Sequence, residues 1–217
     1  MKVKQAIHRI AQILPLKKNL DELESAEAVI YHAVLTSFYQ QGSAATGSQL
    51  EEIDPEAMKH LQKLASLDML TLDDAGNVRG CYPFTMEQRV HRMQINGHQV
   101  HAMCALDALA PAAMFECPSV VDSECAVTGE AVHIELDNQT VLNPDAVAGL
   151  QFGINWMAAS GCCSCSDSLC TEMLFLKDLD TATVWLQQDP DNREIFDLEQ
   201  AIAFSVGLFK PMMSRLS

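Results

Sequence analysis

The sequence predicts an α+β fold in which a helical N-terminal module of the winged-helix type precedes a core of mixed helices and strands. Three observations predict it. Apolar residues recur at helical spacing before residue 70, a hairpin turn follows at Asp73–Asn77, and strand and helix patterns alternate after Pro83. We therefore expect two modules, residues 1–82 and residues 83–217, with no repeat or low-complexity linker between them.

The expected N-terminal helices have clear end signals. Lys4–Leu14 is ended by Pro15, and Ser25–Tyr39 is ended by Gly42. The core face of the second helix is expected to carry the apolar residues Ala26, Val29, Ile30, Ala33 and Val34.

A short element at Thr46–Ile53 precedes the last helix of this module. Asp54-Pro55-Glu56 supplies an N-cap and a first-turn proline for that helix, whose apolar stripe is Met58, Leu61, Leu64 and Leu67. Met69–Leu72 and the residues from Val78 onward are expected to form the two strands of the wing.

The charge of the chain argues against nucleic-acid binding. The formal net charge is -15. The second half of the helical segment that would contact DNA in a winged helix carries Glu51, Glu52, Asp54 and Glu56. Acidic side chains repel the phosphate backbone, so the helical module is expected to be a scaffold or lid for the rest of the chain.

The second module is predicted to be mixed. Val90–Val100 forms two strands around the turn Asn96-Gly97, and Ala102–Met114 is an apolar helix broken late by Pro111. The remaining expected elements are the strands Val132–Leu136 and Thr171–Leu176, the helix Thr181–Gln188, and the helix Asp197–Phe209 capped by Asp197.

The chain is expected to be cytoplasmic. Its start lacks the apolar centre and cleavage site of a signal peptide, and no stretch approaches the roughly 18 apolar residues of a membrane span. Cysteines stay reduced in that compartment, where they point to metal or redox chemistry. Any one of the eight cysteines, taken alone, can instead be a small buried apolar residue that takes part in no chemistry.

The cysteines are concentrated in one run. Cys162, Cys163 and Cys165 lie within four residues, and Cys170 follows shortly after. A structural zinc site needs two separated ligand pairs, which this run does not provide. Thiolates select soft metals, so the pattern favours a thiophilic ion of low coordination number.

A second group of reactive residues lies at Cys104 and Asp107. If the segment is helical, residues three apart share a face, so the thiol and the carboxyl group can meet. A thiolate near a helix start is favoured by the macrodipole, and the carboxyl group can move a proton. The alternative is a helix-cap region with a buried cysteine.

Three segments resemble the alkylmercury lyase (organomercurial lyase) family. Met103–Leu109 is similar to its Cys-Ala-Leu-Asp helix, and Cys125–Gly129 is similar to its Cys-Ala-x-Thr-Gly turn. Cys170, with the downstream residues Phe175, Leu176, Thr181, Ala182 and Trp185, looks like the segment of the second active cysteine. The helical N-terminal module also fits the family. The resemblance therefore implies a core domain of the alkylmercury lyase type.

The resemblance implies protonolysis of the carbon–mercury bond to a hydrocarbon and Hg(II). Cys104 and Cys170 would bind mercury as thiolates, Asp107 would relay the proton, and Cys125 would be structural. No cofactor is required. External thiols would be co-reactants, and a mercuric reductase would be a possible acceptor of Hg(II). An organomercurial would be the substrate, without nucleic-acid or membrane partners.

Two positions depart from the family pattern. Thr171 follows Cys170 where the family often has a second cysteine, and Met103 stands where the family has an aromatic residue. Cys162, Cys163 and Cys165 are either extra thiols that capture or release mercury, or one of them replaces Cys170. The alternative functions are a non-enzymatic binder or chaperone for Hg(II) or Cu(I), and a metal-responsive regulator.

Overall fold

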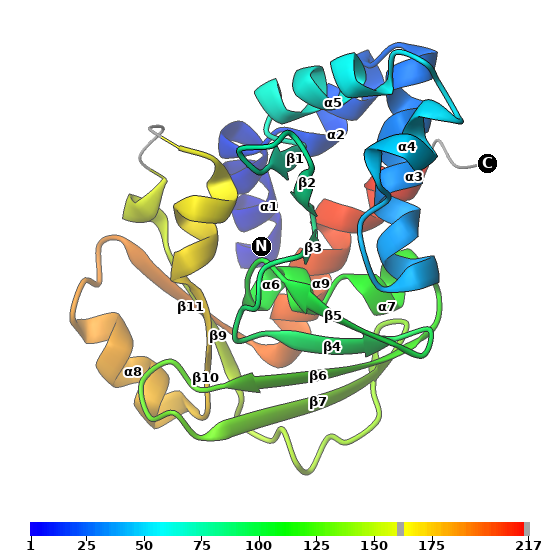
Figure 1. Ribbon diagram of the computed structural model, residues 1–217. Helices are drawn as coiled ribbons and strands as arrows, with labels where there is room; N and C mark the ends of the chain where they lie inside the picture. Colours follow the sequence, from blue (N-terminus) through cyan, green and yellow to red (C-terminus); the bar gives the residue numbers. More distant parts are fainter. Residues whose placement is uncertain (160–162, 215–217) are drawn as a thin grey trace.

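The computed structural model describes residues 1–159 and 163–214 (Figure 1). Most helices of the N-terminal part lie at one end, and a long antiparallel sheet, a smaller sheet and further helices form the rest. The predicted α+β class is confirmed. One continuous core of buried apolar side chains runs through both parts, with a small satellite around Trp185.

The N-terminal part has the predicted order of helices followed by a hairpin. Its helices are α1 (Lys2–Ile13), α2 (Leu16–Glu22), α3 (Ser25–Gln41), α4 (Gly47–Glu51) and α5 (Ala57–Ser66). Strands β1 (Leu70–Leu72) and β2 (Val78–Cys81) then form the expected antiparallel hairpin. Helix α2 was not predicted, because its apolar residues are too few to show a periodicity.

Two details of these helices were predicted wrongly. Val29 is 51% exposed, because the buried face of α3 is rotated toward Ile30, Tyr31, Val34, Leu35 and Phe38. The next helix, α5, has Glu56 rather than Asp54 at its N-cap position. The Asp54 carboxylate instead accepts the backbone N–H of Glu56 at 2.7 Å, which stabilises the preceding turn.

An eight-stranded antiparallel sheet carries the chain from the N-terminal part into the core. Its order is β1-β2-β3-β5-β4-β6-β7-β8. The strands after the wing are β3 (Phe84–Thr85), β4 (Arg92–Ile95), β5 (His98–Ala102), β6 (Pro118–Glu124), β7 (Ala131–Asp137) and β8 (Thr140–Val141). Because β2 pairs with β3, the sheet continues across residue 82. The division into two modules at that residue remains a proposal.

The β4–β5 hairpin has the predicted turn. Asn96 and Gly97 have φ angles of 50° and 78°, the left-handed values that a two-residue turn requires. This hairpin ends at Ala102, directly before the segment that carries Cys104.

The helix predicted for Ala102–Met114 is wrong in its extent. The segment contains two short helices, α6 (Ala105–Ala108) and α7 (Pro111–Met114). Ala102 is still part of β5, and Cys104 has extended backbone at the N-cap of α6. Pro111 begins a helix rather than ending one, because a proline at the first helical position loses no hydrogen bond.

A smaller antiparallel sheet lies beside α8 and α9 (Figure 1). Its order is β10-β9-β11, with β9 (Gln151–Asn155) between β10 (Met173–Leu176) and β11 (Arg193–Asp197). The helices are α8 (Leu179–Gln187) and α9 (Leu198–Phe209), and the predicted cap by Asp197 is confirmed. Short 3-10 turns lie at Trp156–Ala158, Cys165–Asp167, Leu169–Glu172 and Lys210–Met213. Thr171 belongs to one of these turns rather than to the predicted strand.

No helix among the described residues is long and apolar enough to cross a membrane.

Gly80 on β2 occupies a position where any side chain would collide. A Cβ there would lie 2.8 Å from the Phe84 carbonyl oxygen and 2.5 Å from Met103 Cε. We expect Gly80→Ala to lower the free energy of unfolding by about 1–3 kcal/mol in chemical denaturation. Gly47→Ala is the control, since its Cβ would only touch Met58 at 3.4 Å. Equal stability of the two variants would contradict the assigned crowding.

Candidate active site

Cys104 and Asp107 meet on the first turn of α6, as their spacing predicts. The Cys104 thiol donates to Asp107 Oδ2 at 2.7 Å, and the backbone N–H of Asp107 donates to Cys104 Sγ at 3.4 Å. From the helix behind them, Ser205 donates its hydroxyl to the Leu106 carbonyl. The turn that carries Cys104 and Asp107 is therefore held by hydrogen bonds within it and by one hydrogen bond from α9.

Cys170 completes a three-membered group. It lies in the 3-10 turn Leu169–Glu172, directly before β10, and its Sγ is 3.9 Å from Asp107 Oδ2. The possible ligand atoms of Cys104, Asp107 and Cys170 all lie within 4.8 Å of one another. Among residues 1–159 and 163–214, this is the one such cluster of three or more potential metal ligands. Cys170 follows Asp107 by 63 positions in the sequence, whereas Cys104 and Asp107 are three apart.

The described cysteines upstream of Cys170 lie in different environments. Cys165 is buried, and its Sγ lies 3.8 Å from Cys170 Sγ. Cys163 is exposed, with its thiol 3.8 Å from the Asp167 carbonyl. Cys162 lies outside the described residues. Of the extra thiols in the described chain, Cys165 is thus the one that contacts the cluster.

All three members of the cluster are removed from water. Cys104 and Asp107 are each 1% exposed, and Cys170 is 4% exposed. Burial disfavours the carboxylate and raises the pKa of Asp107 to about 7, although hydrogen bonds from the two thiols oppose this rise. Asp107 Oδ1 has no hydrogen-bond partner. The carboxyl group can therefore exist in either protonation state near neutral pH.

The thiols are held in their neutral form. Burial raises the pKa of Cys104 to about 12, and the negative charge of Asp107 adds to the rise. The pKa of Cys170 is raised well above its ordinary value, because its hydrogen bonds with the Cys104 and Cys165 thiols and its burial favour the neutral form. The expected stabilisation of the Cys104 thiolate by a helix dipole is thus outweighed, since α6 has only four residues.

A cavity of about 430 Å³ leads to one side of the cluster. Cys170 lines this cavity together with Arg89, His91, Met103 and Phe175. A much smaller space of about 10 Å³ lies on the inner side, bordered by Cys104, Asp107, Cys165 and Cys170. Cys170 borders both spaces, so it is the member of the cluster that a molecule in the larger cavity would reach first.

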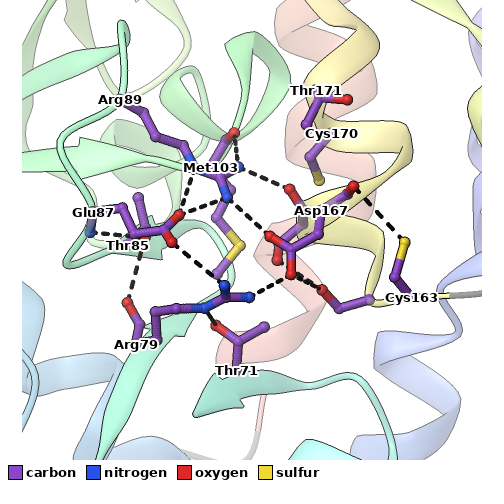
Figure 2. A network of polar contacts seen from close by, with 12 residues as sticks. Thr71, Arg79, Thr85, Glu87, Arg89, Met103, Cys163, Asp167, Cys170 and Thr171 are labelled. Atoms are coloured by element: carbon purple, nitrogen blue, oxygen red, sulfur yellow. Dashed lines mark hydrogen bonds and ion pairs between the residues drawn. The ribbon is translucent and has the colours of Figure 1, made fainter. Parts of the chain in front are cut away.

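Arg89 connects the two segments that carry the cluster (Figure 2). Its Nη1 donates to the Met103 carbonyl at 2.9 Å and to the Ser166 carbonyl at 2.8 Å. Met103 precedes Cys104, and Ser166 lies between Cys165 and Cys170. One guanidinium therefore fixes the spacing between the two halves of the site.

Asp167 anchors the cysteine segment from its other side (Figure 2). Its carboxylate binds Arg79 at 2.5 Å and Arg89 at 3.4 Å, and it accepts the Ser164 hydroxyl. Burial raises the pKa of Asp167, but the hydrogen bond from Arg79 and the other donors outweigh it, so the pKa is lowered overall. The charged form persists, and the ion pairs hold the segment against β2.

The role of Cys125 stays a prediction. It follows β6, is buried, and accepts the backbone N–H of Lys177 at 3.4 Å. Burial raises the pKa of its thiol, but hydrogen bonds from Thr128 and neighbouring backbone amides outweigh this, so the pKa is lowered. This contact joins the residue after β6 to the residue after β10, which supports the structural role expected from the sequence.

Two residues of the site were not predicted from the sequence. Arg89 has no motif around it, and its contacts are to backbone carbonyls, which leave no mark in a sequence pattern. Met173 places its Sδ 3.5 Å from Cys104 Sγ. A methionine at the start of a strand is indistinguishable from a core residue unless the fold is known.

A model of the alkylmercury lyase family matches residues 84–210. The alkylmercury lyase of Staphylococcus epidermidis is 27% identical over 150 residues, which cover 69% of this chain and 64% of that protein. The alkylmercury lyase of Bacillus cereus is 25% identical over 73% of this chain and 67% of its own length. The matched region thus spans about two-thirds of these curated relatives.

The fold agrees with that match. A crystal structure of the mercury-bound form of MerB2 superposes with a TM-score of 0.73, covering 92% of this chain and 98% of that one at 19% identity. This similarity extends over the N-terminal part, which lies outside the region matched by the family model. The family match covers more than half of the chain, and it includes all three members of the buried cluster. The chain therefore belongs to the alkylmercury lyase family.

Proposed function

We propose that this chain is an alkylmercury lyase that converts an organomercurial into a hydrocarbon and Hg(II). The observation that carries the proposal is the buried group of Cys104, Asp107 and Cys170, whose ligand atoms lie within 4.8 Å of one another. Two thiolates suit a soft ion such as mercury, and the carboxyl group between them suits proton transfer.

Cys170 would make the first contact with substrate. Cys170 lines the larger cavity, whereas Cys104 borders the smaller inner space and not the larger one. The cavity walls near it include Met103 and Phe175, which offer an apolar surface to the organic group. An organomercurial thiolate entering this cavity would then exchange its external thiol for the two protein sulfurs.

The protons balance with Asp107 as the carrier. Two thiols lose one proton each as their sulfurs bind mercury. One proton leaves with the displaced external thiol, and the other passes through Asp107 to the carbon as the carbon–mercury bond breaks. The 2.7 Å contact between Cys104 Sγ and Asp107 Oδ2 supports this transfer. Electron density from two thiolates makes the mercury-bound carbon more basic.

No organic cofactor is needed, because the thiols and the carboxyl group supply all the groups that the reaction uses. External thiols act as co-reactants that deliver the organomercurial and collect Hg(II), and a mercuric reductase is a suitable acceptor. We place the protein in the cytoplasm, where thiols stay reduced.

Hydrocarbon release tests the function directly. We expect methane from methylmercury, or benzene from phenylmercury, in the presence of excess thiol. Asp107→Ala should still bind mercury through its two thiols but lose most turnover, because the carbon then lacks its proton donor. The loss should reach about 10²–10⁴-fold.

Two results of the same assay would contradict the proposed function or the role of Asp107. Hydrocarbon release no faster than the thiol-only background would refute the lyase proposal. Turnover unchanged in Asp107→Ala would refute the role of that residue alone. Asp137→Ala, at the exposed end of β7, is a matched control that should behave like the unmodified protein.

The raised pKa of Asp107 predicts the pH dependence of the reaction. Only the carboxylate can accept a thiol proton, and its fraction rises with pH through the pKa of about 7. In single-turnover experiments, the rate should rise about tenfold per pH unit below that value and level off above it. The inflection should be absent in Asp107→Ala. A rate that does not change with pH between roughly 5 and 8 would contradict the role of Asp107 as the proton acceptor.

Arg89 is predicted to be a positioning residue. Arg89→Lys keeps the charge but cannot hold both carbonyls and two carboxylates with one planar group. We expect Hg(II) affinity, measured by dithiol competition, to fall about 10–100-fold. Arg92→Lys, on the exposed face of β4, is the control. If both variants bind Hg(II) like the unmodified protein, Arg89 does not set the spacing of the thiols.

A further inference from the structure

We infer that Cys165 is a third thiolate ligand for Hg(II), so that the metal is held by the sulfurs of Cys104, Cys165 and Cys170. The inference deepens the proposed function, on which it rests for the origin of the metal. Cys165 belongs to the dense cysteine run, whose spacing does not suit a zinc site and which the two-thiolate reaction does not use. As a third ligand, Cys165 has a specific role.

One distance supports Cys165 as a third sulfur ligand. Cys165 Sγ lies 3.8 Å from Cys170 Sγ, and Cys170 Sγ lies no more than 4.8 Å from Cys104 Sγ. With a metal–thiolate bond of about 2.3 Å, as in zinc sites, three sulfurs in a plane around an ion lie about 4.0 Å apart. Two sulfurs on opposite sides of an ion would lie about 4.6 Å apart. The Cys165–Cys170 pair is therefore close to the planar spacing. Cys165 does not belong to the group of ligand atoms within 4.8 Å of one another, so a three-thiolate complex requires its side chain to move toward Cys104 when the metal binds.

The side chain of Cys165 reaches the same inner space as the cluster. Cys165 is 4% exposed, and it borders the small cavity together with Cys104, Asp107 and Cys170. Burial of a thiol beside two other thiols and a carboxyl group concentrates soft ligands in a region that water does not reach.

The backbone of Cys165 is fixed by the N-terminal part of the chain. Its N–H donates to Asp68 Oδ2 at 2.8 Å, and the next N–H, of Ser166, donates to the Tyr82 hydroxyl at 2.9 Å. Tyr82 in turn donates to Asp68 Oδ1. These bonds, with the Arg89 contact to the Ser166 carbonyl, hold Cys165 at its distance from Cys170.

The binding step balances without a further reactant. Hg(II) bound to the thiolates of Cys104 and Cys170 gains a bond to Cys165 sulfur, and the Cys165 thiol loses its proton. The Asp107 carboxylate accepts that proton, so the total charge of the buried site is unchanged. No bond to mercury has to break first, and no electron is transferred. Outside thiols can then remove the metal by successive exchange.

Sulfur coordination can be measured with inorganic Hg(II) alone. The reduced full-length protein, loaded with one equivalent of Hg(II), should give three sulfur neighbours in X-ray absorption spectra and the longer-wavelength charge-transfer absorption of a three-thiolate complex. Cys165→Ser should give two sulfur neighbours. Its Hg(II) affinity in dithiol competition should fall about 10–100-fold or more.

The double variant Cys162→Ser/Cys163→Ser is the matched control. It removes the other two thiols of the run, and it should keep three sulfur neighbours and the affinity of the unmodified protein. This result supports the inference even if Cys165→Ser does not fold. Two sulfur neighbours in the unmodified protein, or three in Cys165→Ser, would overturn the inference.

The outcome is independent of the lyase assay. Hydrocarbon release with only two sulfur neighbours would leave the proposed function intact and refute the third ligand. Three sulfur neighbours without hydrocarbon release would support the third ligand and refute the lyase.

Discussion

A carboxyl group kept away from water between two thiols is the constraint on which the rest of this structure depends. Asp107 is almost completely buried, and one of its oxygens has no hydrogen-bond partner. Such burial costs stability unless the group is neutral or well paired. Here it brings the pKa of Asp107 close to neutrality while keeping both thiols protonated. The same desolvation thus prepares a proton carrier beside soft ligands that need a base before they can bind a metal.

That arrangement requires two distant segments to be held at a fixed spacing. The segment with Cys104 and Asp107 leaves the large sheet after β5, and the segment with Cys170 enters the small sheet before β10. Arg89 bridges them through backbone carbonyls. The N-terminal part contributes Asp68 and Tyr82 to the same segment. The helical module is therefore joined to the site by hydrogen bonds as well as by the shared core, which fits the scaffold role expected from its acidic surface.

The parts of the fold that were predictable are those governed by local chemistry. The Asn96-Gly97 hairpin and the Asp197 cap depend on neighbours within a few residues, and both are confirmed. The strands β9 and β11 were not predicted. In β9, Gly153 weakens the strand signal, and it is there because a Cβ would lie 2.9 Å from the Trp185 ring. The apolar run around Pro111 was read as one helix, since periodicity alone cannot show that Cys104 has extended backbone.

By itself, the sequence determined the set of chemical groups and one of their contacts. The three-residue spacing of Cys104 and Asp107 places them on one turn, and the resemblance of separate segments pointed to Cys170. Only the tertiary structure decided which thiol of the described part of the run lies beside them, because Cys165 is buried 3.8 Å from Cys170 whereas Cys163 is exposed. The pKa of Asp107 and the bridge through Arg89 were likewise decided by packing. Burial and contacts between distant segments arise from how the sheets and helices meet, and no local pattern records them.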